Sequence, residues 1–215
     1  MIERLLEDDV ARAMRAAFNA PVPLPVLVEN VLDPTVAEEL TYGLASLDGW
    51  RAEHFLEEFL GGTKRVAAEE FESASALARF ASWQTIDLDS GPQHSLLAPL
   101  LHALSSRTFL DHLRSLGPSG IGEPRFKLRR YGPGDFFAAH TDGSSGMGVL
   151  IYLTDPPWQE GDGGCFVYES PSGTSRFPPR FNSALVFPYQ DDAPHHVEPV
   201  SPTGSIRYTL GCDYA

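Results

Sequence analysis

Residues 125–142 read RFKLRRYGPGDFFAAHTD, and this stretch holds the features that decide the fold and the chemistry. Its run Phe126–Tyr131 is short, rich in aromatic and aliphatic residues, and closed by a Gly-Pro-Gly turn, which is typical of a β-strand. The stretch ends in His140-Thr141-Asp142. Side chains at i and i+2 of a strand point the same way, so this imidazole and carboxylate can bind one ion.

Further short strand-like runs follow this stretch, each bounded by Gly, Pro, Asp or Ser. They are Gly148–Leu153, Gly164–Tyr168, Ala184–Phe187 and Ile206–Gly211. Of the chain's 19 glycines and 18 prolines, 14 and 12 lie from Gly117 onward. Because these residues interrupt helices and build turns, the C-terminal half is predicted to be a β-sandwich or barrel.

The part before Gly117 has helical periodicity, with apolar residues recurring every three or four positions. Asp33-Pro34 is a good N-cap followed by an N1 proline. The expected helices cover about 2–18, 34–44, 71–78, 96–104 and 109–116, and a short strand covers 26–28. With no repeat or linker, residues 1–215 are expected to form one domain: 1–116 helix-rich support with a possible lid, and 117–215 most of the β-structure with the metal site.

Composition excludes several classes of function. The 215 residues include 16 Lys+Arg and 29 Asp+Glu, for a net charge of −13, which argues against a nucleic-acid partner. No apolar run approaches the ~20 residues that cross a bilayer, and the acidic N-terminus MIERLLEDD is unlike a signal peptide. We therefore expect a cytoplasmic protein with no membrane partner. Cys165 and Cys212 are too few for a disulfide framework or a cysteine zinc site.

A third metal ligand has candidates in the run PHHVEPV, residues 194–200. Either His195 or His196 could complete a two-histidine, one-carboxylate triad, which leaves positions open on iron. Neighbouring strand residues face opposite sides, so only one of the two can point inward. His196 with Glu198 is a rival i, i+2 pair.

Arg207 is a charged residue inside the otherwise strand-like run SIRYTL. A buried arginine needs an anionic partner, and its planar guanidinium suits a carboxylate. Thr209, two residues later, would face the same ligand.

Together these pieces resemble the iron(II)- and 2-oxoglutarate-dependent oxygenases of the prolyl 4-hydroxylase-like group. The resemblance runs from Phe126 to Tyr214, with a weaker echo in residues 26–47, and rests on five pieces in the family's order. These are RFKLRRYGPGDFFAAHTD (125–142), GVLIYLTDPPW (148–158), GDGGCFVYE (161–169), NSALVFPYQDDAPHHVEPV (182–200) and RYTL (207–210). It implies a mainly β fold with supporting α-helices, built on a double-stranded β-helix (jelly-roll, cupin-like) core.

The resemblance also implies roles for individual residues. The expected iron ligands are His140, Asp142 and His195. The family pattern around the last of these is a ligand histidine, one variable residue, valine, and a Pro-Val that begins two residues after the valine. Arg207 and Thr209 look like the residues that hold the distal carboxylate of 2-oxoglutarate. Tyr131 and Tyr152 match positions where similar enzymes place tyrosines near that carboxylate.

Two departures from the family concern the substrate pocket. Cys165 stands where the family often has glutamate, and the last strand lacks the usual tryptophan. Counting by twos from Arg207 puts Asp213 on the inward face, where it could meet a cationic part of the substrate; an exposed aspartate is the alternative. Lys127 and Arg129 share parity with Tyr131, so one of them is expected to line the pocket and hold an anionic group.

The implied reaction is hydroxylation of an unactivated C–H bond, with release of succinate and CO2. It would use Fe(II), 2-oxoglutarate and O2, with ascorbate as a possible stimulant, and a substrate of amino-acid type: a small metabolite, or a peptide or protein side chain such as proline. Because Asp142 is present, hydroxylation is favoured over halogenation. Residues 50–71, with Gly61-Gly62 as a hinge candidate, are a candidate lid. The alternatives are a jelly-roll protein that binds a metal or small ligand without turnover and a scaffold with a degenerate site.

Overall fold

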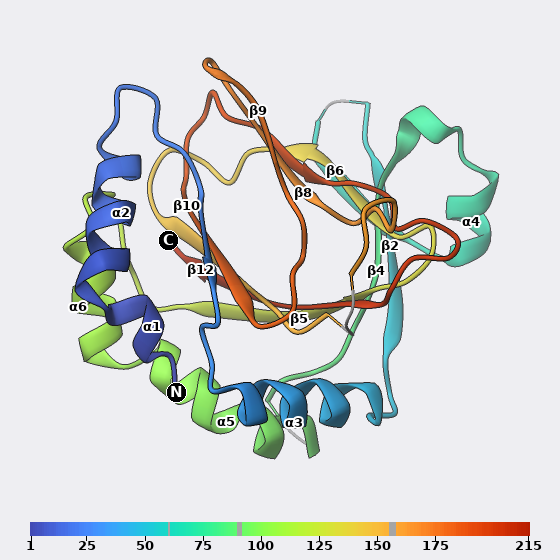
Figure 1. Ribbon diagram of the computed structural model, residues 1–215. Helices are drawn as coiled ribbons and strands as arrows, with labels where there is room; N and C mark the ends of the chain where they lie inside the picture. Colours follow the sequence, from blue (N-terminus) through green and yellow to red (C-terminus); the bar gives the residue numbers. More distant parts are fainter. Residues whose placement is uncertain (60, 90–91, 155–157) are drawn as a thin grey trace.

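The computed structural model, which describes residues 1–59, 61–89, 92–154 and 158–215, is built around a sheet of antiparallel strands (Figure 1). Each strand pair among these residues is antiparallel. The strands are β1 (Val26–Glu29), β2 (Arg51–Glu57), β3 (Thr63–Val66), β4 (Arg79–Thr85), β5 (Arg125–Tyr131), β6 (Phe136–His140), β7 (Met147–Tyr152), β8 (Phe166–Ser170), β9 (Gly173–Phe177), β10 (Ser183–Pro188), β11 (His195–Val197) and β12 (Arg207–Tyr214).

The helices lie mostly in the first half of the chain, as the apolar periodicity predicts. They are α1 (Glu3–Leu6), α2 (Asp8–Phe18), α3 (Pro34–Ala45), α4 (Ala68–Ser73), a 3-10 turn Ala76–Ala78, α5 (Pro92–Leu104) and α6 (Arg107–Arg114). Asp33 caps α3 as expected, because its carboxylate accepts a hydrogen bond from the Thr35 amide at 3.0 Å. None of the helices described is long and apolar enough to span a bilayer.

The sheet curls into a nearly closed barrel, consistent with the predicted jelly-roll. Its strand order is β1-β10-β7-β12-β5-β4-β6-β11-β8-β9, so β4 joins two halves that face each other. One half, β10-β7-β12-β5, is covered on its outer side by α2, α3, α5 and α6 (Figure 1). The other half, β6-β11-β8-β9, carries His140 and His195 at paired positions. The fold therefore brings the C-terminal strand opposite the two histidines.

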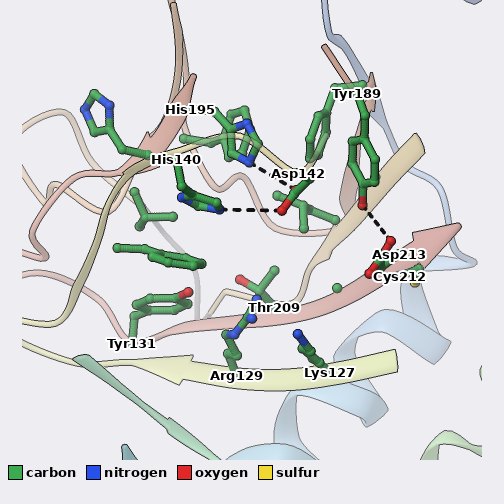
Figure 2. Close-up of a pocket in the computed structure, with 18 of the residues that line it drawn as sticks. Lys127, Arg129, Tyr131, His140, Asp142, Tyr189, His195, Thr209, Cys212 and Asp213 are labelled. Carbon is green, nitrogen blue, oxygen red and sulfur yellow. Dashed lines mark hydrogen bonds and ion pairs between the residues drawn. The ribbon is translucent and has the colours of Figure 1, made fainter. Parts of the chain in front are cut away.

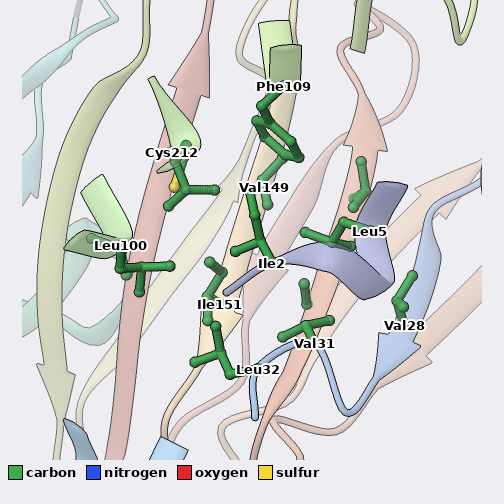
Figure 3. Close-up of a cluster of buried hydrophobic side chains, with 14 of the residues drawn as sticks. Ile2, Leu5, Val28, Val31, Leu32, Leu100, Phe109, Val149, Ile151 and Cys212 are labelled. Carbon is green, nitrogen blue, oxygen red and sulfur yellow. The ribbon is translucent and has the colours of Figure 1, made fainter. Parts of the chain in front are cut away.

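One large apolar cluster joins the helices to the outer face of the β10-β7-β12-β5 half. It includes Leu5 of α1, Leu100 of α5 and Phe109 of α6, packed over Val149 and Cys212 (Figure 3). Both cysteines are buried and free. Buried apolar area of this kind is the main source of stability, so the N-terminal helices hold the sheet that carries the site.

The strand predictions are confirmed in position, with shifts of one to three residues at the ends. Three strands in the N-terminal half, β2, β3 and β4, were not expected. β2 reads RAEHFLE and β4 reads RFASWQT, and neither has the apolar-polar alternation from which strands are inferred.

One prediction before Gly117 needs correction. The helix expected over residues 71–78 is wrong, because α4 ends at Ser73, Ala74 is extended, and Leu77 is 93% exposed instead of packed. The candidate lid, residues 50–71, contains β2, β3 and the start of α4; β2 pairs with β3, and Gly61 and Gly62 have positive φ. Its role as a lid stays a prediction. Leu60 of this segment, and residues 155–157 of the piece GVLIYLTDPPW, lie outside the described residues.

Candidate metal and cosubstrate site

His140, Asp142 and His195 come together inside the barrel, with their ligand atoms all within 4.8 Å of one another. His195 Nε2 lies 3.3 Å from Asp142 Oδ2, and His140 Nε2 lies 3.8 Å from Asp142 Oδ1 (Figure 2). His140 ends β6 and pairs directly with His195 at the start of β11. The antiparallel register therefore supplies the third ligand that the pair at positions 140 and 142 lacks.

The two imidazoles are held in place before any metal binds. His140 Nδ1 lies 2.9 Å from the Ala138 carbonyl, so this nitrogen carries the proton and Nε2 is free to bind a metal. The His140 ring stacks on Phe137 at 3.9 Å, and the His195 ring stacks on Phe166 at 5.1 Å. Burial, followed by the nearby His195, lowers the pKa of His140 to about 4, which keeps its ring neutral at physiological pH.

His196 and Glu198 do not form the rival pair. The His196 ring is directed toward Glu169, with Nδ1 and Oε1 3.5 Å apart. Glu198 forms a bidentate pair with Arg176, at 2.7 and 2.8 Å. Of the two adjacent histidines, the structure therefore buries His195 beside Asp142 and turns His196 to the other side of β11.

Arg207 of β12 lines the same cavity on the side opposite the triad and is only 2% exposed. Its Nε donates to Thr209 Oγ1 at 3.0 Å and its Nη1 donates to the Gly164 carbonyl at 2.5 Å. The guanidinium also lies 5.0 Å from the ring centres of Tyr131 and Tyr152. No carboxylate among the described residues pairs with this buried cation, so the position suits a bound anion.

The two tyrosines differ in their access to the cavity. Tyr131 lines the cavity, whereas Tyr152 lies behind it, fully buried. The Tyr152 hydroxyl has no hydrogen-bond partner among the described residues, and burial raises its pKa to about 12. A neutral hydroxyl beside Arg207 is a hydrogen-bond donor available to an anion.

The cavity, with a volume of about 130 Å³, lies between the two halves of the barrel. Its floor is the pair β5 and β12, where Arg207 stands opposite Tyr131, Thr209 opposite Arg129, Gly211 opposite Lys127 and Asp213 opposite Arg125. All eight line the cavity, so Lys127, Arg129 and Asp213 lie on its inward face; that any of them binds substrate stays a prediction. Asp213, however, is engaged by Arg125 Nη2 at 2.5 Å. It also accepts a hydrogen bond from the Tyr189 hydroxyl at 3.0 Å (Figure 2).

Several lining residues were not anticipated from the sequence. Tyr189 follows β10 and reaches Asp213, and Phe137 precedes His140 on β6. Arg125 shares parity with Lys127 and Arg129, so counting by twos one residue further would have found it. Tyr189 gives no such signal, because it lies beyond the end of its strand.

Two histidines and one carboxylate gathered inside a jelly-roll are the donor set that non-heme iron oxygenases use. Residues 126–212 match the family model of the 2OG-Fe(II) oxygenase superfamily. The match covers β5 to β12, including the triad and Arg207, and supports a 2-oxoglutarate-dependent dioxygenase. A search of curated proteins finds no match to this chain.

Solved structures share the fold at low sequence identity. A prolyl-4-hydroxylase from Pseudomonas putida is 18% identical, with a TM-score of 0.65 over 95% of this chain and 97% of that one. A prolyl hydroxylase from Trichoplax adhaerens, solved with a peptide fragment of hypoxia inducible factor, is 17% identical, with a TM-score of 0.64 over 96% and 89%. A 2OG-Fe(II) oxygenase family protein from Burkholderia pseudomallei is 16% identical, with a TM-score of 0.61 over 97% and 92%.

Proposed function

We propose that this protein is an Fe(II)- and 2-oxoglutarate-dependent hydroxylase of an amino-acid-type substrate. The observation that carries the proposal is the position of the triad and of Arg207 on opposite walls of one cavity. A protein that only binds a metal has no need for a buried arginine without a carboxylate partner. In the balanced reaction, 2-oxoglutarate, O2 and R–H become succinate, CO2 and R–OH.

In this proposal His140, Asp142 and His195 hold Fe(II), which when bound supplies the activation of O2. The donor set fits iron, since it offers two neutral imidazole nitrogens and one carboxylate and leaves further positions open. Arg207 pairs with the distal carboxylate of 2-oxoglutarate, Thr209 orients Arg207 through its hydroxyl, and Tyr131 and Tyr152 flank that carboxylate. Ascorbate is expected to be stimulatory.

The substrate is a small molecule or a peptide. The Trichoplax adhaerens neighbour was solved with a peptide, and the Pseudomonas putida neighbour is a prolyl-4-hydroxylase, so a prolyl peptide belongs in the first substrate panel. We also propose that residues 1–215 act as one oxygenase domain, because a single apolar cluster contains residues from Ile2 to Tyr214.

Turnover of 2-oxoglutarate tests the proposal. Purified protein with Fe(II), ascorbate and 2-oxoglutarate should form succinate, and cell extract treated with the enzyme should gain products heavier by one oxygen atom. A protein that binds Fe(II) but forms no succinate with any substrate, and shows no visible band dependent on 2-oxoglutarate, would instead be the non-catalytic metal-binding jelly-roll.

Replacing Arg207 provides the residue-level test of cosubstrate binding. Arg207→Ala should raise the KM for 2-oxoglutarate by about 100-fold, because a charge-assisted contact contributes up to about 3 kcal/mol. The matched control is Arg129→Ala, which removes a cation from the same cavity and should change that KM far less. Steady-state kinetics with varied 2-oxoglutarate measures both, and equal effects would contradict the assignment of Arg207.

A further inference from the structure

Strand β5 aims three cations at the cavity, and they are not equivalent. Arg125 is neutralised by Asp213. Lys127 and Arg129 form no ion pair or hydrogen bond among the described residues, although both side chains point from the floor toward the triad (Figure 2). In a chain of net charge −13, two adjacent cations facing a cavity without a carboxylate partner need a reason.

Arg129 is fixed by aromatic rings. Its guanidinium carbon lies 4.6 Å from the Trp83 ring centre and 5.6 Å from the Phe137 ring centre. Cation–π contacts of this kind hold the side chain in one position and leave its N–H groups free. Arg129 is therefore ordered before a ligand arrives, which reduces the entropy cost of binding.

Lys127 lies beside Arg129 on the same face of β5 and opposite Gly211, which has no side chain to cover it. Burial, followed by repulsion from Arg129, lowers the pKa of Lys127. An anion placed between the two side chains would relieve this repulsion and be bound by both.

The balance of charge in the cavity points to the same ligand. Its described lining holds four permanent cations, Arg125, Lys127, Arg129 and Arg207, and two carboxylates, Asp142 and Asp213. Asp213 is used by Arg125, Asp142 belongs to the proposed metal site, and Arg207 is assigned to 2-oxoglutarate. Lys127 and Arg129 remain as the cations that no bound group has neutralised.

A second hollow of about 340 Å³ lies next to the cavity, on the other side of these two residues. Lys127, Arg129 and Phe137 line both spaces. Beyond them the hollow is walled by Phe55 and Phe80 together with Trp83, from β2 and β4. Trp83 and Phe55 stack at 5.0 Å. The Glu53 carboxylate also lines this hollow, but it already has partners: it pairs with Arg65 at 3.2 Å and accepts a hydrogen bond from Trp83 Nε1 at 3.2 Å.

We propose that Lys127 and Arg129 bind the carboxylate of the substrate, whose apolar part lies on the aromatic wall formed by Phe55, Phe80, Trp83 and Phe137. This inference rests on the proposed function and names its substrate class: an organic acid with an aromatic or aliphatic body, either free or as an acidic side chain of a peptide. Arg129 is the central residue, because it is part of the anion site and also contacts the Trp83 and Phe137 rings of the wall.

Matched acids and amides test this inference without turnover. The protein is loaded with Zn(II) and 2-oxoglutarate, and calorimetry measures the binding of 3-phenylpropionate against 3-phenylpropionamide, and of N-acetyl-L-phenylalanine against its primary amide. A capped pentapeptide with a central glutamate, and its glutamine version, cover the peptide source. At least one acid should bind about tenfold or more tightly than its amide, because two charge-assisted contacts are lost in the amide.

Variants assign that preference to the two residues. Arg129→Gln and Lys127→Gln should each reduce the acid preference by about threefold or more, whereas Lys127→Arg should retain it. Arg130→Gln is the control, because Arg130 lies on the other face of β5, over Trp50 at 4.9 Å. If only the peptide pair shows a preference, with the glutamate peptide bound more tightly than the glutamine peptide, the result supports the anion site and identifies the substrate as a peptide.

The inference is overturned if no acid outbinds its amide at millimolar concentration, or if the preference survives in Arg129→Gln. It is also overturned if Arg129→Gln weakens the binding of 2-oxoglutarate more than the binding of the acid. The heat of 2-oxoglutarate binding, measured first in each sample, separates the two proposals. If wild-type protein gives no heat with 2-oxoglutarate, the proposed cosubstrate site is contradicted. If it gives this heat but binds no acid more tightly than the matching amide, only the proposed substrate site is contradicted.

Discussion

Asp142 lies between two imidazoles, and its carboxylate oxygens approach both His140 and His195. Burial would raise the pKa of Asp142, but the hydrogen bond and charge of His195 outweigh burial and lower it. The carboxylate therefore stays ionised beside a neutral His140, and these are the forms in which these two groups bind a divalent metal.

Metal content should distinguish the two adjacent histidines. His195→Ala should reduce affinity for Fe(II) by more than about 100-fold, because loss of a ligand exceeds the usual 10–100-fold effect of residues that only orient one. His196→Ala should leave metal content close to that of the wild type, since His196 faces Glu169. Metal analysis after dialysis measures both, and the reverse order would contradict the choice of His195.

The pKa of His140 predicts how the metal-free protein responds to acid. The pKa is about 4 in the folded state and about 6.5 in the unfolded chain, so below pH 6.5 the unfolded chain binds a proton that the folded state does not. This contribution to stability is present above pH 6.5 and is lost as the pH falls toward 4, by about 2 kcal/mol at pH 5.

Urea unfolding with a chelator at pH 7.5 and pH 5 tests this response. His140→Asn should lose about 2 kcal/mol less than the wild type between the two pH values, because its side chain does not titrate. Equal losses in both proteins would show that His140 does not carry the acid sensitivity.

At the scale of the elements, one buried polar residue fixes the start of strand β10. Asn182, which precedes β10, has a φ of 54° and is 2% exposed. Its side-chain Oδ1 accepts from the Leu32 amide and its Nδ2 donates to the Leu32 carbonyl, both at 2.9 Å. This residue therefore joins the segment between β1 and α3 to the sheet, where β10 pairs with both β1 and β7.

Removing the Asn182 side chain should destabilise the fold. Asn182→Ala should lower the free energy of unfolding by about 3 kcal/mol, because it leaves a buried amide and carbonyl of Leu32 unpaired and keeps a strained φ. Asn30→Ala is the control: Asn30 has a φ of 56° but is exposed, so only about 1 kcal/mol is expected. Urea unfolding compares the two, and equal effects would assign the loss to backbone strain alone.

For the whole molecule, the helices and the sheet share their apolar cluster. Its members come from α1, α2, α3, α5 and α6 and from the strands of the β10-β7-β12-β5 half. Two smaller clusters join the half that carries the histidines to the rest of the barrel: one around Phe166 includes residues of β7 and β10, and one around Trp83 includes residues of β4 and β5. The site thus lies between two halves that share their inner packing, and the helices cover the outer side of one of them.

Thermal unfolding should therefore show one cooperative transition, with equal calorimetric and van't Hoff enthalpies. The reason is that, in the part of the chain that the structure describes, no separate core supports residues 1–116 alone. Zn(II) with 2-oxoglutarate at about 100 times their dissociation constants should stabilise this transition by about 2.7 kcal/mol or more. Differential scanning calorimetry measures both effects. Two transitions, with only one responding to the ligands, would contradict a single domain.

Local residue patterns alone determined much of this protein. The pair of His140 and Asp142, the short strands, and the inward parity of Arg207, Asp213, Lys127 and Arg129 follow from a side-chain period of two, which needs no knowledge of the fold. The resemblance to 2-oxoglutarate oxygenases added His195, and the geometry agrees with that choice.

Long-range pairing decided the rest. Strands β2 and β4 lack apolar alternation, and only pairing with each other and with β5 and β6 makes them part of the barrel and of the aromatic wall. The engagement of Asp213 by Arg125 and Tyr189, and the lack of a carboxylate for Lys127 and Arg129, likewise depend on which strands become neighbours. Period and parity are local properties of a strand, whereas the partner of a charge is set by residues far away in the sequence.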